Sequence, residues 1–173
     1  GKCIETGESF NNENWSKWTA KSIAKALPGA VEFTKYAESM GVDVFYISNR
    51  GVSEFESTLK NLQSEKFAFA DSGHLLLKED DSSKKGRREQ VAKNYEIILL
   101  IGDNLGDFTE ILDDRTKNYG FDLVDQFEKE FGDKFIVLPN PMYGAWEKPL
   151  YNFNRNLTEQ EKYKLRKANI ISY

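Results

Sequence analysis

The sequence predicts an α/β fold with a parallel sheet, because short apolar strands alternate with amphipathic helices along the chain. The first observation is the run of five aliphatic residues at 97–101, which suits a strand covered on both faces. The second is a short apolar run at 135–138, which follows a helical pattern that stops at Gly132. No linker interrupts the 173 residues, so we expect one domain, residues 1–173, with helices on both faces of the sheet.

In the first half of the chain we expect two helices, a strand and a third helix. Asn11-Asn12 signals the start of a helical pattern over 9–26, and Pro28-Gly29 ends it and begins the next helix. Gly41 is predicted to cap this second helix, before a strand at 42–47. The third helix carries apolar residues at i, i+4 and i+7 and supplies the crossover of a βαβ unit: Phe55, Leu59 and Leu62.

The second half continues the alternation of strands and helices. A short apolar strand at 75–77 precedes a polar loop, and the next helix opens with the basic run 84–88. After an acidic loop, an amphipathic helix over 123–131 leads to the second apolar strand. The capping box at 158–161 starts a last helix that extends to about residue 168.

Composition and charge exclude several classes of protein. With a net charge of -4 and a pI of about 5.2, the chain offers no basic face for an extended nucleic acid. Cys3 and His74 are the only residues of their kinds, which excludes a disulfide framework and a Cys/His zinc site. No apolar run approaches the length of a membrane span and no signal peptide precedes Cys3, so we expect a mature, trimmed or cytoplasmic chain.

Two carboxylates follow the aliphatic strand directly. Asp103 and Asp107 lie four residues apart, after Gly102. Ligands of a parallel sheet bind beyond the carboxyl ends of its strands, so both acids are expected in a crevice. Hard oxygen ligands without His or Cys favour Mg²⁺, which binds through one or two carboxylates and a substrate phosphate. From this motif alone, an Asp-rich turn that closes a strand is an equal alternative.

Other polar and aromatic residues are expected near the same edge of the sheet. Ser48-Asn49, between a strand and a helix, can bind an anion together with free helix N–H groups. Most cations of 84–88 are expected on a solvated face, whereas one lysine held toward the strand ends would neutralise a phosphate. Trp15 packs either in the core or beside a pocket, and Tyr143 lies in a stiff loop where its ring can stack on a base.

These motifs occur in an order that a known superfamily shares. A serine at a strand end, a lysine before a helix and Gly-Asp-x-x-x-Asp resemble motifs two, three and four of the haloacid dehalogenase-like (HAD) phosphohydrolases. Four segments are similar, more specifically, to the class C acid phosphatases, which are bacterial lipoprotein phosphatases and 5′-nucleotidases: Tyr46–Arg50, Leu75–Lys84, Ile101–Phe108 and Leu138–Glu147. The resemblance covers the chain from Thr6 through the last helix.

The resemblance implies a role for each candidate residue. Ser48 and the neighbouring Asn49 would bind the transferring phosphoryl group, and Lys84 would stabilise its charge. Asp103 would ligate Mg²⁺, and Asp107 would orient Lys84 or a water on the metal. Trp15 and Tyr143 would stack on opposite faces of the base or ring of the substrate.

The protein implied by the resemblance is a Mg²⁺-dependent acid phosphatase with a Rossmann-like HAD fold and a small helical cap at 9–27. It would hydrolyse phosphomonoesters, above all nucleoside monophosphates, through an aspartyl-phosphate intermediate. Its expected location is outside the cytoplasm, either secreted or at the bacterial cell surface. Membrane attachment would require a lipid anchor that this chain lacks, and the sequence leaves a homodimer open.

One departure from the family concerns its first motif, an apolar strand followed by Asp-x-Asp-x-Thr that supplies the nucleophile and the general acid and base. That motif should precede Thr6, and no Asp-x-Asp occurs on a strand end in residues 1–173. In the family fold this first strand lies between the strands ending at Ser48 and Gly102, so we expect a sheet without its centre. The alternative to an enzyme is a non-catalytic surface protein that binds a nucleotide or a partner.

Overall fold

The computed structural model describes residues 5–7, 11–113, 115–140, 144–154 and 156–170. The chain forms two compact units, Gly1–Ser82 and Ser83–Tyr173. Within the described ranges, no helix combines the length and the apolar character needed to cross a membrane. The predicted α/β class is confirmed. The assignment of one domain and the cap role of 9–27 stay predictions.

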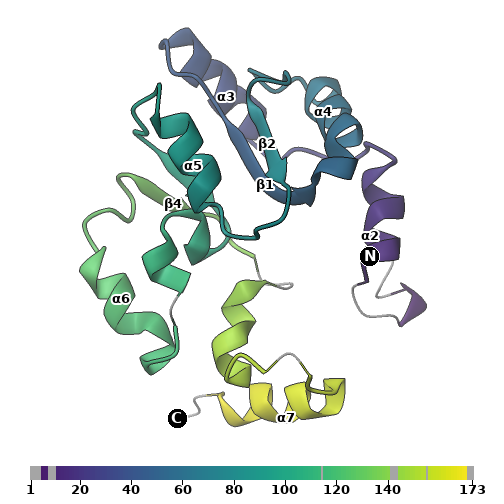
Figure 1. The fold of residues 1–173 in the computed structure, drawn as a ribbon, viewed down its shortest axis with the longest axis vertical. Helices are drawn as coiled ribbons and strands as arrows, with labels where there is room; N and C mark the ends of the chain where they lie inside the picture. Colours follow the sequence, from purple (N-terminus) through teal and green to yellow (C-terminus); the bar gives the residue numbers. More distant parts are fainter. Residues whose placement is uncertain (1–4, 8–10, 114, 141–143, 155, 171–173) are drawn as a thin grey trace. The chain divides into compact units, whose positions relative to one another are not determined.

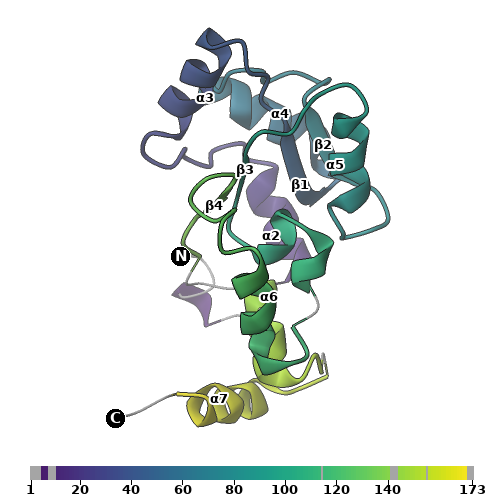
Figure 2. The ribbon, with the colours of Figure 1, turned by 90° about the vertical axis from the view of Figure 1, so that its left-hand side faces the viewer.

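The first unit contains a pair of parallel strands with helices beside it. Its elements in chain order are α2 (Asn12–Thr19), α3 (Ala30–Ser39), β1 (Tyr46–Gly51), the 3₁₀ turn η1 (Val52–Glu54), α4 (Phe55–Ser64) and β2 (Leu75–Lys78). Tyr46 pairs with Leu75, and Ile47 pairs with Leu76. Both ribbon views show α3 and α4 beside this strand pair (Figures 1 and 2).

The predicted helix limits in this unit match the structure, with one exception. The side chain of Asn11 caps α2 as predicted, and Gly41 follows α3 with a φ of 76°. The first helix was expected to continue to residue 26, but α2 ends at Thr19. The reason is that the buried side chain of Asn61 bonds both backbone groups of Ala24, each at 2.9 Å, which replaces the helical hydrogen bonds.

Strand β1 is displaced from its predicted position. The sequence places a strand at 42–47, whereas the observed strand, Tyr46–Gly51, includes Ser48 and Asn49. Its pairing with β2 is irregular after Ile47, so the strand continues as a distorted segment instead of ending there. Ser48 therefore lies within the bulged part of β1 and not beyond the end of the strand.

The second unit contains another parallel pair, in which Leu100 lies opposite Phe135 and Ile101 lies opposite Ile136. Thr158 caps the last helix by accepting the N–H of Glu161 at 3.3 Å, so the predicted capping box is confirmed. The elements in chain order are α5 (Lys85–Ala92), β3 (Leu100–Gly102), η2 (Leu105–Asp107), η3 (Glu110–Asp113), η4 (Asn118–Gly120), α6 (Phe121–Gln126), β4 (Phe135–Val137), η5 (Ala145–Tyr151) and α7 (Glu159–Ala168).

The core of the second unit is aromatic, and the strand in front of the acidic loop is packed less completely. Phe108 and Phe135 are buried, with stacked rings whose centroids are 5.0 Å apart. By contrast, Ile101 is 43% exposed and Ile98 is 55% exposed. The expected strand over 97–101 with both faces covered is therefore wrong, because β3 is short and pairs only with β4 in the described chain.

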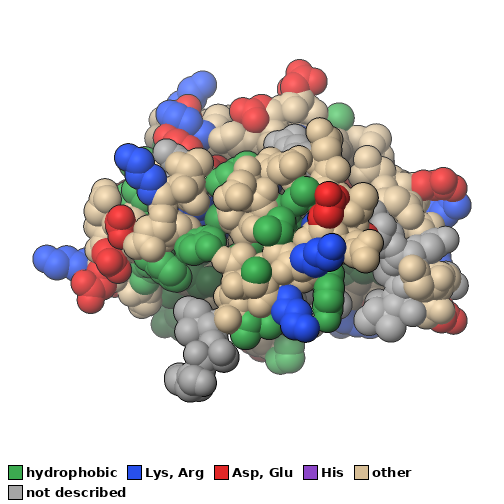
Figure 3. All heavy atoms as spheres, turned by 90° about the horizontal axis from the view of Figure 1, so that it is seen from below, with side chains coloured by type: hydrophobic (Ala, Val, Ile, Leu, Met, Phe, Trp, Pro, Cys, Tyr) green, Lys and Arg blue, Asp and Glu red, His purple; other side chains and the backbone are tan. Residues whose placement is uncertain are grey.

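Each parallel pair is a separate two-stranded sheet among the described residues. Within the described chain, β1 and β3 are therefore each an edge strand of their own sheet. Apolar side chains also reach the surface, among charges of both signs, on the face shown in Figure 3.

Candidate active site

The acidic loop after β3 is held in shape by one of its own carboxylates. Oδ2 of Asp107 accepts hydrogen bonds from the backbone N–H groups of Asp103 and Asn104, each at 3.1 Å. The side chain of Asn104 in turn accepts the N–H of Gly106 at 3.3 Å. Asp107 thus shapes the loop that presents the exposed side chain of Asp103 at the carboxyl end of β3.

The glycine at the start of this loop is required by a close approach. A Cβ built at Gly102 would lie 2.4 Å from Oδ2 of Asp107, well inside van der Waals contact. A side chain at this position would force the loop to move. The Gly-Asp-x-x-x-Asp spacing therefore has a geometric reason, because the carboxylate of Asp107 folds back over the end of the strand.

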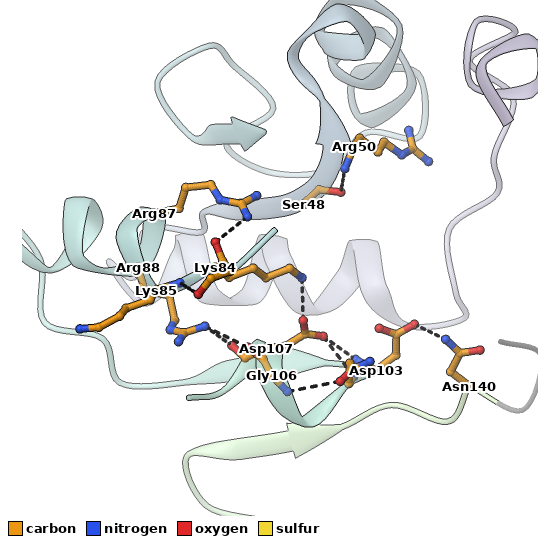
Figure 4. A network of polar contacts seen from close by, with 12 residues as sticks. Ser48, Arg50, Lys84, Lys85, Arg87, Arg88, Asp103, Gly106, Asp107 and Asn140 are labelled. Atoms are coloured by element: carbon orange, nitrogen blue, oxygen red, sulfur yellow. Dashed lines mark hydrogen bonds and ion pairs between the residues drawn. The ribbon is translucent and has the colours of Figure 1, made fainter. Parts of the chain in front are cut away.

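Lys84 lies against this loop. Its Nζ is 2.8 Å from Oδ1 of Asp107, and the two side chains are only 19% and 14% exposed (Figure 4). Low exposure strengthens such a pair, because little water screens the two charges. The structure thus brings together three of the predicted site residues, Lys84, Asp103 and Asp107, in one unit.

The neighbouring lysine has different partners. Lys85 Nζ lies 2.7 Å from Glu89 and 3.4 Å from Glu110. Hydrogen bonds to these two carboxylates, the one to Glu89 first, raise the pKa of Lys85. Lys84 rather than Lys85 is therefore the lysine held toward the strand end, as the family resemblance implies.

Asn140, in the loop after β4, reaches the acidic loop as well. Its amide Nδ2 donates to Oδ2 of Asp103 at 2.7 Å (Figure 4). The backbone N–H of Leu138 also donates to the carbonyl of Gly102 at 2.8 Å, which extends the strand pairing toward this contact. Asn140 therefore fixes one carboxylate oxygen of Asp103 and so orients the other.

The remaining described candidates lie in the first unit. Oγ of Ser48 accepts the backbone N–H of Arg50 at 3.2 Å, and Asn49 is exposed. The guanidinium of Arg50 lies 5.6 Å from the ring centroid of Trp15 and 5.7 Å from that of Trp18, a cation–π geometry. Trp15 and the strand that carries Ser48 are thus neighbours within this unit. Tyr143 lies outside the described residues.

Comparison with known proteins identifies the family. Residues 1–146 match the family model of the HAD superfamily, subfamily IIIB (acid phosphatase). The chain belongs to this family. It is also similar to two solved structures, the class C acid phosphatase from Bacillus anthracis and the same class C enzyme with tungstate bound. Each matches at 40% sequence identity and a TM-score of 0.92, over 99% of this chain and 72% of the solved chain.

The family assignment confirms the resemblance to the class C acid phosphatases and the HAD fold. It makes this chain a phosphomonoesterase by family, and it favours the enzyme over the non-catalytic alternative. Phosphatases of this superfamily generally use a divalent metal, which is the cofactor class expected here.

The donor set of this acid phosphatase fits a sparsely ligated hard cation. Among the described residues, no group of three or more His, Cys, Asp or Glu side chains is assembled for a metal. Mg²⁺ normally keeps several waters and binds through one or two carboxylates plus substrate phosphate, so it needs no such group. An exposed Asp103 carboxylate with one oxygen fixed by Asn140 provides a ligand of that kind.

Sequence reasoning missed two residues of this arrangement. One is Asn140, and the other is Arg88, whose guanidinium donates to the carbonyls of Gly106 and Asp107 in the acidic loop. Asn140 directly follows a strand, and side chains after neighbouring parallel strands meet at one edge of the sheet, so its position was a usable signal. Arg88 was grouped with a solvated basic face, although it lies four residues after Lys84 and therefore on the same helix face.

Proposed function

We propose that this acid phosphatase depends on Mg²⁺ and acts on nucleoside monophosphates and related small phosphomonoesters. The observation that carries the proposal is the little-exposed Lys84–Asp107 pair next to the exposed Asp103, at the carboxyl end of β3. An ammonium group and a carboxylate ligand at the same strand end are the groups that a transferring phosphoryl group requires, because its catalysis depends on positioning and charge stabilisation.

The candidate site residues each have a part in this proposal. Lys84 is proposed to bind a phosphoryl oxygen. A phosphate-binding role is proposed separately for Ser48 with the backbone at Asn49, as the family resemblance implies. Asp103 would hold the metal, which when bound supplies charge neutralisation for the phosphate. The tungstate in the related Bacillus anthracis enzyme supports the proposal, since tungstate is a tetrahedral oxyanion of the same shape as phosphate.

The reaction is proposed to pass through an aspartyl-phosphate, as the family resemblance implies. The nucleophile of that route belongs to an Asp-x-Asp motif that residues 1–173 do not contain. The contribution of this chain is therefore to bind the phosphoryl group and to offset its charge. We further propose that the protein acts outside the cytoplasm, with a lipid anchor as the only membrane attachment and with a homodimer as a possible assembly.

Replacing Lys84 by alanine tests the proposed site. We expect Lys84→Ala to lower kcat by about a hundredfold, as removal of one charge-stabilising donor does in other enzymes. Steady-state kinetics of the full encoded protein measures this, with Lys85→Ala as the matched control because Lys85 pairs with Glu89 and Glu110 instead. A larger loss in Lys85→Ala than in Lys84→Ala would place the functional lysine one residue later.

Replacing Trp15 by alanine tests the preference for a nucleotide base. Stacking of a base on an aromatic ring is worth about 1–3 kcal/mol, so we expect Trp15→Ala to raise the KM of a nucleoside monophosphate by about tenfold. An alkyl phosphate, which has no ring to stack, serves as the control substrate and should change little. Equal losses for the two substrates would show that Trp15 supports the fold around Arg50 and does not select the substrate.

A further inference from the structure

Helix α5 opens with a charge arrangement that opposes helix formation. Lys84 at the N-cap is followed by three more cations within the first turn, Lys85, Arg87 and Arg88, and this turn contains no acidic residue. The helix dipole disfavours cations at this end, so the arrangement is unfavourable for local stability. Departures from local preference of this kind concentrate at functional sites, which directs attention to the partners of each cation.

Arg88 is the most buried of these cations. Its relative exposure is 8%, and its Nη1 donates to the backbone carbonyls of Gly106 and Asp107, at 3.2 and 3.1 Å. Its Nη2 donates to Oε2 of Glu110 at 3.2 Å. The guanidinium thus joins α5 to both η2 and η3. Figure 4 shows its contacts with Gly106 and Asp107 as dashed lines.

Arg88 and Lys84 hold the same residue from two sides. They lie one helical turn apart, since the backbone N–H of Arg88 donates to the carbonyl of Lys84 at 3.0 Å. Lys84 binds the side chain of Asp107, and Arg88 binds its main chain. Because Asp107 in turn accepts the N–H of Asp103, a displacement of α5 would disturb the lysine and the acidic loop together.

We propose that Arg88 is a positioning residue for phosphoryl transfer, which fixes Lys84 relative to the acidic loop by clamping the backbone at Gly106 and Asp107. This inference rests on the proposed function of Lys84. The planar fork of arginine can donate to two carbonyls and a carboxylate at once, whereas the single ammonium of a lysine cannot reproduce that geometry. The requirement is therefore for the guanidinium, and a positive charge alone does not satisfy it.

The test is a double-mutant cycle on the full encoded protein, with Arg88→Met and Arg88→Lys made in the wild type and in Lys84→Ala. We expect Arg88→Met to lower kcat by about thirtyfold with KM changed by less than about threefold, since a displaced catalytic group loses rate more than binding. Arg88→Lys should recover little of this loss. In the Lys84→Ala background Arg88→Met should cost less than about threefold more, because residues that act together are not additive.

Lys85→Met is the matched control, since it removes a cation that contacts Glu110 without touching the carbonyls of the loop. It should keep kcat within about twofold of the wild type. If Arg88→Met does not unfold cooperatively, Arg88→Lys decides by the same criteria, because it keeps the charge and the aliphatic stem.

Three results would overturn the proposal. If Lys84→Ala is impaired while Arg88→Lys keeps the wild-type kcat, or if the two losses multiply fully in the double variant, Arg88 does not act through Lys84. If Lys84→Ala itself keeps the wild-type kcat, the proposed function of that lysine fails, and the role of Arg88 fails with it. The two failures are thus distinguished by the single Lys84 variant.

Discussion

Asp103→Asn is expected to remove most of the Mg²⁺-dependent phosphatase activity of the full encoded protein, about a hundredfold or more in kcat. The substitution keeps the shape of the side chain and loses one coordinating charge at the place where the cation must offset the phosphate. Because Asp103 is exposed, thermal unfolding should remain cooperative. The measurement is phosphate release as a function of Mg²⁺ concentration in the wild type and the variant.

Asp125→Asn is a suitable control, because it removes the same charge from an exposed position on α6 of the same unit. It should leave both the rate and the Mg²⁺ requirement unchanged. An Asp103→Asn enzyme with the wild-type rate and the wild-type Mg²⁺ requirement would contradict the assignment of Asp103 as the metal ligand.

Residues 1–173 expressed by themselves are expected not to fold stably. In the described chain, β1 pairs as a strand with β2 and β3 pairs with β4, each in a two-stranded sheet, and Ile101 beside the acidic loop is 43% exposed. Isolated two-stranded sheets are marginal in water. In the family fold a further strand pairs with both neighbours, and each buried backbone group that loses such a partner costs about 1–3 kcal/mol, so the loss of several would exceed a typical net stability of about 5–15 kcal/mol.

Circular dichroism during heating, combined with size-exclusion chromatography, checks this expectation. The predicted result is a broad, non-cooperative loss of signal, or an ordered species only in an oligomer where another chain supplies a strand. A cooperative transition from an isolated monomer would show that both strand pairs are stable without a further strand between them.

The motifs could be predicted from sequence because their residue types are tied to local geometry. Gly102 is a glycine because Asp107 folds back over it, and Lys84 precedes a helix from which it reaches the same carboxylate. Signals of this kind depend on spacing within a few residues. They located the acidic loop and the capping box of α7 without any knowledge of distant contacts. The choice of Lys84 among the basic residues came from the family resemblance, and its function stays a prediction.

Long-range contacts decided the features that the sequence did not predict. The side chain of Asn61 ends the first helix early, although it lies 37 residues from Ala24. Arg88 was assigned to a solvated face, because its spacing from Lys84 gives the shared helix face but does not predict its bonds to the carbonyls of Gly106 and Asp107, 18 and 19 residues away. Only the last two residues of the aliphatic run at 97–101, Leu100 and Ile101, lie in a strand, and the burial expected for the run depends on a complete sheet that the described strands do not form.

The most direct test of the account is phosphate release from a nucleoside monophosphate by the full encoded wild-type protein, assayed with a metal chelator and after addition of Mg²⁺. We expect hydrolysis that the chelator abolishes and that Mg²⁺ restores, with a lower KM than for an alkyl phosphate. Hydrolysis that persists in the chelator, or no hydrolysis of any phosphomonoester with Mg²⁺ present, would contradict the proposed function.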